Sequence, residues 1–170
     1  MLTANLPGGV GTDPATGNIF VTGGFSGSID LGGGPITTPW GQNGGIFLVN
    51  YGSSGNWLWN KACGASGDAG TAVTADGNGN VTFTGSAAGL IDFANTGIPT
   101  SANGFIVATF TTAGGYRWSQ RGGTSWGYGV AYDFLGHLLC TGNFSSSLDF
   151  GGISLTAQGM PDGFVAQYAR

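Results

Sequence analysis

The sequence predicts an all-β chain made of three repeats, each a sheet of four antiparallel strands. Three observations carry this prediction. A stretch that begins with Gly and ends in Thr-Gly occurs at residues 17–23, 79–85 and 136–142. Apolar runs beginning at Gly45, Gly104 and Gly163 follow one another at intervals of 59 residues. No segment shows the helical period of about 3.6 residues. A repeat of this length indicates stacked supersecondary units.

Each repeat contains strand-like segments in a fixed order. Small residues fill the first, which suits a strand close to a neighbour. The second is the Thr-Gly stretch, where Val81 and Phe83 alternate with threonines, the two-residue period of a strand with unlike faces. The third is a continuous apolar run, which indicates burial on both faces. The remaining segments are 9–13, 72–76 and 129–133 (first kind), 45–49, 104–108 and 163–166 (third), and the Trp-containing 55–59 and 114–118 (fourth).

The composition is that of a folded protein with few charges. Glycine makes up 36 of the 170 residues, but hydrophobic residues are 41% and aromatic residues 12%. That apolar content can form a core, and no Gly-x-y period indicates collagen. Charged residues are only 7%, with four Lys and Arg and a net charge of −4. Nucleic acid is therefore not an expected partner, and no apolar run is long enough to predict a membrane span.

Four strands joined by consecutive hairpins make one antiparallel sheet, and such sheets repeated with short Gly-rich links are typical of β-propeller blades. A β-helix is the other all-β repeat architecture, but its coils are much shorter than this repeat. We therefore interpret residues 1–170 as one propeller segment. Its expected blades are 8–63, 64–122 and 123–170.

The ends of the chain fit this pattern unevenly. Counting 59 residues back from Trp59 places Leu2–Leu6 where a fourth strand belongs, whereas 59 residues after Trp118 is position 177, beyond residue 170. We therefore expect strand 1–6 to complete the last blade. Propellers have about 4–8 blades, so three are too few for a ring. The sequence predicts a homodimer in which two copies form one six-bladed ring.

The order of motifs within the repeat resembles that of the bacterial seven-bladed β-propeller (SBBP-type) repeat. The motifs are Val-x-x-Asp, Gly-Asn-Val-x-x-Thr-Gly, Asp-Phe, Gly-Phe-Val-Ala and Trp. The best matches are Asp133, Thr141-Gly142, Asp149-Phe150 and residues 162–166, whereas Gln167 replaces the Lys often found there. The resemblance implies a propeller fold and a bacterial extracellular or cell-surface location. It implies no catalytic residue, and the N-terminus lacks the form of a signal peptide.

One hairpin has oxygen-bearing side chains at alternate positions. Asp76, Asn78 and Asn80 have the spacing of a calcium loop, but the Glu that closes an EF-hand is missing. The other interpretation is an Asn/Gly turn in which the Asp side chain caps the backbone. We expect the turn and no cofactor, and calcium stays the alternative.

The aromatic residues fall into two groups. Trp59 and Trp118 follow the repeat and are expected in the core. Trp40, Trp126 and Tyr128 do not follow it, and we place them in connections between strands. Exposed aromatic residues there would stack on sugar rings or bind a protein partner. The alternative is that they fold back over small cores.

No catalytic constellation is evident. Asp30, Asp92 and Asp149 recur in every repeat, which favours a structural role as acceptors for backbone N–H groups. The only histidine, His137, occupies a turn position, and no Gly-x-Ser-x-Gly motif accompanies it. Cys140 replaces an apolar strand residue and is expected to be buried. Cys63 matches Gly122 at a strand end, and two cysteines are too few for a disulfide framework or a zinc site.

The sequence thus favours a non-catalytic binding or scaffold module that assembles through blade complementation. Its first expected partner is a second copy of itself, and a glycan or a protein is a further ligand. The alternatives are a lectin-like propeller that uses the loop aromatics, and an enzyme with a site on the propeller axis. Fold analogy alone does not decide among them.

Overall fold

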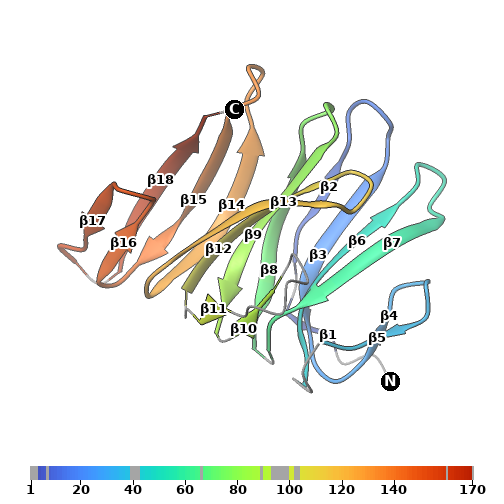
Figure 1. Cartoon of the computed structure of the whole chain (residues 1–170), viewed down its shortest axis with the longest axis horizontal. Helices are drawn as coiled ribbons and strands as arrows, with labels where there is room; N and C mark the ends of the chain where they lie inside the picture. The colour runs from blue at the N-terminus through green and yellow to red at the C-terminus, as the bar shows by residue number, and fades with distance from the viewer. Residues whose placement is uncertain are drawn as a thin grey trace.

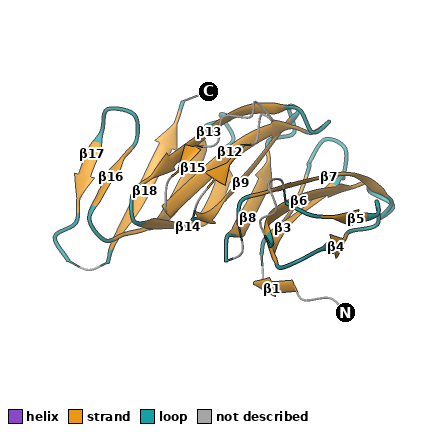
Figure 2. Ribbon diagram, turned by 60° about the horizontal axis from the view of Figure 1, so that its bottom comes forward, coloured by secondary structure: helices purple, strands orange, loops and turns teal. Residues whose placement is uncertain are grey.

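A computed structural model describes residues 4–6, 8–38, 43–65, 67–88, 90–92, 100–101, 104–159 and 161–169. These residues form β-strands, turns and bends, with no helix, so the all-β prediction is confirmed. Three main antiparallel sheets lie side by side, and their strands fan out across the molecule (Figures 1 and 2). None of the sheets closes on itself.

Sheet 1 contains β1 (Ala4–Leu6), β2 (Val10–Thr12), β3 (Ile19–Phe25), β6 (Gly45–Tyr51) and β7 (Trp57–Cys63). Sheet 2 contains β8 (Ala69–Ala75), β9 (Asn80–Ala87), β12 (Gly104–Thr111) and β13 (Tyr116–Gly122). Sheet 3 contains β14 (Ser125–Tyr132), β15 (Leu138–Phe144) and β18 (Asp162–Tyr168).

The three sheets share one register, which explains the Thr-Gly motif. Thr22 lies opposite Leu48 in sheet 1, and Thr84 lies opposite Val107 in sheet 2. Each buried Thr hydroxyl donates a hydrogen bond of 2.8 Å to a carbonyl of the neighbouring strand, at Phe47 and Ile106 respectively. The Gly that follows lets the innermost strand approach. A Cβ on Gly85 would lie 2.0 Å from the carbonyl oxygen of Ala69.

The N-terminal strand does not complete the last sheet, so that prediction is wrong for this structure. β1 pairs with β3, at Gly24 and Phe25, beside the stretch that pairs with β2. β8 pairs with β9 in the same way, and its register shifts between Gly70 and Ala72. β1 and β2 are therefore the two halves of the innermost strand of sheet 1. They were misplaced because a repeat count ignores the extra residues in the 13–18 hairpin.

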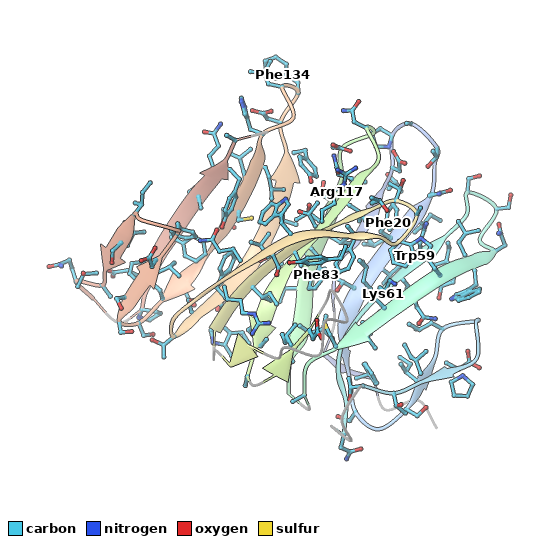
Figure 3. The ribbon with its side chains drawn as sticks, in the orientation of Figure 1. Phe20, Trp59, Lys61, Phe83, Arg117 and Phe134 are labelled. Atoms are coloured by element: carbon cyan, nitrogen blue, oxygen red, sulfur yellow. The ribbon has the colours of Figure 1, made fainter. Side chains whose placement is uncertain are left out.

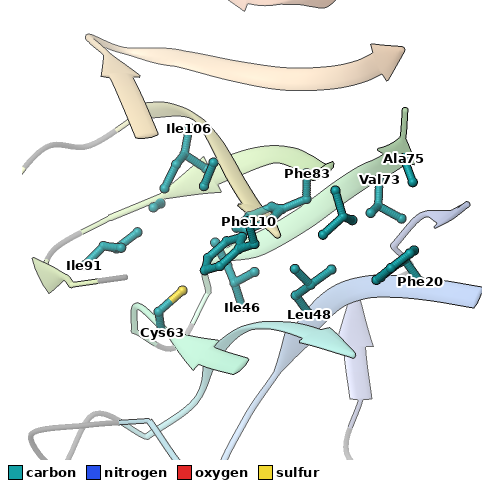
Figure 4. Packing of buried hydrophobic residues seen from close by; sticks show 13 residues of the cluster. Phe20, Ile46, Leu48, Cys63, Val73, Ala75, Phe83, Ile91, Ile106 and Phe110 are labelled. Carbon is teal, nitrogen blue, oxygen red and sulfur yellow. The ribbon is translucent and has the colours of Figure 1, made fainter. Parts of the chain in front are cut away.

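Apolar cores fill the two junctions between sheets. Phe83 lies in the core between sheets 1 and 2, against which Trp59 packs (Figure 4). Phe105 lies in the core between sheets 2 and 3, against which Trp118 packs. Both Phe side chains are about 1% exposed, as the sequence predicts. A third cluster, which includes Phe25, covers the outer face of sheet 1.

Each connection between the second and third strands contains a small hairpin that the sequence did not reveal. In each, an apolar side chain, from Ile29, Ile91 or Leu148, is buried. Asp30 accepts hydrogen bonds from the backbone N–H groups of Gly32 and Gly34, and Asp149 caps its own turn in the same way. The hairpins are β4 (Ile29–Asp30) with β5 (Pro35–Ile36), β10 (Leu90–Ile91) with β11 (Thr100–Ser101), and β16 (Ser147–Asp149) with β17 (Ser154–Thr156).

Candidate functional site

The candidate calcium residues form a hydrogen-bonded turn. The Oδ1 atom of Asp76 accepts the backbone N–H groups of Asn78 and Asn80, at 2.8 and 2.9 Å. The Asn80 side-chain amide donates to Asp76 Oδ2, and the Asn78 amide donates to the Asp76 carbonyl. Nitrogen donors rather than free oxygens therefore face this carboxylate. The described residues contain no group of three or more His, Cys, Asp or Glu side chains placed to hold a metal.

The electrostatics of the Asp turns follow from these donors. Partial burial alone would raise the pKa of Asp76, but the hydrogen bonds from Asn80 and Asn78 outweigh it and lower that pKa below its ordinary value. His137 occupies the corresponding turn of sheet 3, where its Nδ1 lies 2.8 Å from Asp133 Oδ2. These geometries are those of backbone caps.

The two described aromatic candidates belong to a strand, so their placement in a connection is wrong. Trp126 and Tyr128 both lie in β14, which begins earlier than its small residues suggested. Gly127 permits this early start, because a Cβ there would lie 2.1 Å from Thr84 Oγ1. Trp126 is 48% exposed and Tyr128 is 54% exposed. Trp40 lies outside the described residues.

Trp126 borders a cleft of about 330 Å³ between sheets 2 and 3. Asp68 also borders it, and this buried carboxylate accepts the backbone N–H groups of Ala65 and Ala88 at 2.7 and 2.6 Å. Burial raises the pKa of Asp68 despite these hydrogen bonds. The cleft therefore combines one exposed indole with polar groups, chiefly hydroxyls. Its hydroxyl-bearing lining residues are Ser86, Thr124, Ser125 and Ser145.

The face of sheet 3 that points away from sheet 2 is open, and we call it the end face. It presents Thr141, Val165 and Gln167, which alternate with residues of the core between sheets 2 and 3. Val165 is 70% exposed. By register its counterparts are Leu48 in sheet 1 and Val107 in sheet 2, whose exposed fractions are 2% and 0%. Those two residues are buried because another sheet covers them.

The face of sheet 1 that points away from sheet 2 is its counterpart, and we call it the start face. Val10 is 68% exposed there, whereas its register counterpart Val73, on the covered face of sheet 2, is 6% exposed. The buried residues Phe47 and Val49 lie beside it with the partly buried Val21. An apolar face thus stands open at each end of the stack.

The open faces escape sequence reasoning because their residues match buried ones in type. Val165 reads as a core residue, and only the missing partner sheet exposes it. The one available signal is that segment 163–166 is followed by no fourth strand within the 170 residues.

The two cysteines are buried and not disulfide-bonded. Burial raises the pKa of the Cys140 thiol to about 12, so it is protonated and unreactive at neutral pH. The part of the chain that the structure describes has no helix able to cross a membrane. No model of a known protein family matches the chain, and no curated protein matches it either.

Proposed function

We propose that the three sheets are consecutive propeller blades and that the chain is a non-catalytic scaffold which closes a six-bladed ring with a second copy. The observation that carries this proposal is the exposure of Val165. The same position is covered in both other sheets, each time by the face of the next sheet. The end face thus has the pattern of a junction that has lost its partner.

A second copy supplies the matching surface. The start face of sheet 1 carries the same repeat positions as the faces that cover Leu48 and Val107. The end face of one copy therefore fits the start face of another, in the way that successive sheets already pack within the chain. Fully burying a Val side chain stabilises by about 1.5–3 kcal/mol, and each new junction covers Val10 of one copy and Val165 of the other.

The number of copies follows from ring closure. Contacts between unlike faces give closed rings when the rotation per copy closes and open filaments when it does not. Propellers have about 4–8 blades, so two copies, with six blades, lie in this range and three copies do not. Both junctions of such a dimer are identical.

Static light scattering tests this function. The chain has a mass of 17.0 kDa, and at micromolar concentration we expect twice that value. Val165→Arg should give the monomer mass with an unchanged circular dichroism spectrum, because Val165 is exposed in the single chain. Phe134→Arg is the matched control. Phe134 is 94% exposed at the tip of a turn, away from both open faces (Figure 3), so this variant should keep the dimer mass.

The cleft beside Trp126 favours carbohydrate binding as a second candidate function. An exposed indole next to several hydroxyls can stack on a sugar ring while polar groups bind its hydroxyls. On a glycan array, Trp126→Ala should abolish any binding of the wild-type chain. Trp57→Ala, which removes a partly exposed Trp from β7, should leave that binding intact.

The resemblance to secreted bacterial repeats supports an extracellular or cell-surface location, which we propose together with the scaffold function. Calcium is not part of this proposal. Adding millimolar calcium should therefore leave the melting temperature unchanged, since a ligand that binds only the native state must raise it.

A further inference from the structure

The outer edge of sheet 3 differs from the outer edges of the other two sheets. In sheets 1 and 2 the third strand, β6 or β12, pairs with a fourth strand, β7 or β13. β18 is the counterpart of β6 and β12, and among the described residues it pairs with β15 alone. Its second edge therefore presents backbone N–H and C=O groups without a strand partner. Such an edge is a template for another strand.

The two complete sheets show which strand this edge is shaped to bind. Opposite Tyr51 and Asn50 of β6 stand Trp57 and Trp59. Opposite Phe110 and Thr109 of β12 stand Tyr116 and Trp118. By register the counterparts on β18 are Tyr168 and Gln167. A fourth strand on β18 would thus place an aromatic residue opposite Tyr168 and a Trp opposite Gln167.

A groove beside the edge provides room for the first aromatic side chain. It has a volume of about 220 Å³ and is lined by apolar residues of the β16–β17 hairpin, including Ile153 and Leu155, and by residues 165–168 of β18. In sheet 1 the equivalent hairpin approaches the ring of Trp57 so closely that a Cβ on Gly33 would lie 2.3 Å from it. The groove is the corresponding space, left open.

A second groove marks where the turn before such a strand would lie. In sheet 2 this turn places the Thr112 carbonyl against sheet 1, where it accepts hydrogen bonds from Trp59 Nε1 at 2.9 Å and Asn50 Nδ2 at 3.2 Å. The same place at the next junction is a groove of about 450 Å³, bordered by Trp118 and Tyr168. The buried hydroxyl of Tyr168 has no hydrogen-bond partner among the described residues.

We propose that the outer edge of β18 is a binding site for an extended polypeptide strand with the pattern aromatic-x-Trp, preceded by a tight turn. The occupant is a partner polypeptide, which binds by β-strand addition. Backbone hydrogen bonds to the edge give affinity, and the two aromatic side chains give specificity. In the proposed ring this edge lies on the outer rim, because the fourth strand is the outermost strand of each sheet. The site is therefore separate from the start and end faces.

A peptide with the sequence of residues 111–122 is the direct probe, since it contains the turn and the aromatic-x-Trp pattern. Fluorescence anisotropy of the labelled peptide should show saturable binding to the full chain. Replacing its two aromatic residues, at the positions of Tyr116 and Trp118, by Ala should weaken binding at least about tenfold, as expected of buried aromatic anchors. A scrambled peptide of the same composition controls for its positive charge.

Variants of the protein locate the site. Ile153→Asp places a charge in the apolar groove, and Ile153 is 68% exposed in the chain alone, so folding should be unaffected. We expect at least tenfold weaker peptide binding for this variant and unchanged binding for Phe134→Asp. Equal binding of the scrambled peptide, or unchanged binding by Ile153→Asp, would overturn the proposal.

The mass of the same samples separates this proposal from the ring. A dimer that binds no peptide contradicts the strand site and leaves the ring intact. A monomer that binds the peptide with the expected specificity contradicts the ring and supports the strand site.

Discussion

β12 and β18 occupy the same place in their sheets and have similar sequences, but their surroundings are opposite. In β12 the residues from Phe105 to Phe110 are all buried, because sheets lie on both faces and β9 and β13 on both edges. In β18 only Phe164 is fully buried. The difference teaches that an apolar run predicts where a residue is meant to be buried. Whether it is buried depends on a neighbour that another polypeptide must supply.

The sharpest test of this comparison places one charge at both positions. Val107→Asp buries a carboxylate in the closed core and should cost roughly 4–5 kcal/mol or more of unfolding free energy, enough to unfold many domains. Val165→Asp should leave the fold intact and remove only the dimer. Urea unfolding followed by circular dichroism checks both, and similar losses for the two variants would show that β18 is as enclosed as β12.

The next largest effect concerns the core of sheet 2. Phe105 packs against Phe164 with ring centroids 5.2 Å apart and is almost fully buried. Phe105→Ala should cost about 3–5 kcal/mol, the usual range for a core Phe. The measurement belongs in the Val165→Arg background, where stability does not depend on protein concentration. A loss below about 1 kcal/mol would contradict the packing described for this junction.

The repeated threonines give a smaller contrast. Thr84→Val removes a buried hydroxyl that donates to the Ile106 carbonyl, so we expect a loss of about 1 kcal/mol, the typical net value of such a hydrogen bond. Thr141→Val changes an exposed hydroxyl on the end face and should cost almost nothing in the monomer. If the two substitutions cost the same in chemical denaturation, the end face is not open in the single chain.

The smallest expected effect depends on pH and compares two equivalent positions. Asp68 of sheet 2 and Ser125 of sheet 3 both immediately precede an inner strand residue, Ala69 or Trp126, in the same register. Burial raises the pKa of Asp68 in the folded state. The folded chain thus holds this proton more tightly than the unfolded chain, and the carboxyl lowers stability as pH rises above its unfolded pKa of about 3.9.

Asp68→Ser should remove that dependence. The stability of the wild-type chain relative to the variant should be greatest near about pH 4 and should fall toward about pH 7, as the carboxyl ionises. Urea unfolding at the two pH values measures the difference. A relative stability that rises with pH would mean that the hydrogen bonds from Ala65 and Ala88 outweigh the cost of burying the charge.

The sequence predicted the repeated elements better than it predicted their limits. Alternation at Val81 and Phe83 and the apolar run at 104–108 located strands, since burial on one or both faces imposes those patterns. The start of β14 was missed because Gly127 and Gly129 form a bulge, which carries no apolar signal. The small hairpins were missed because each buries only one apolar anchor, such as Leu148.

The candidate site was predictable only in part. The caps at Asp30 and Asp149 follow from their recurrence in the repeat. The open faces do not, because exposure of Val10 and Val165 depends on which sheets are present rather than on residue type. The cleft beside Trp126 joins residues of two sheets, and local pattern places no such pair together.

The central claim is that the end face of one copy binds the start face of another, and mixing two variants tests it most directly. Val165→Arg blocks only the end face, and Val10→Arg blocks only the start face. Each variant alone should have the monomer mass in sedimentation, because every junction needs one intact face of each kind. Their mixture contains one intact pair and should give a dimer, weaker than wild type because only one junction forms. A mixture that stays monomeric while the wild-type chain dimerises would contradict head-to-tail assembly.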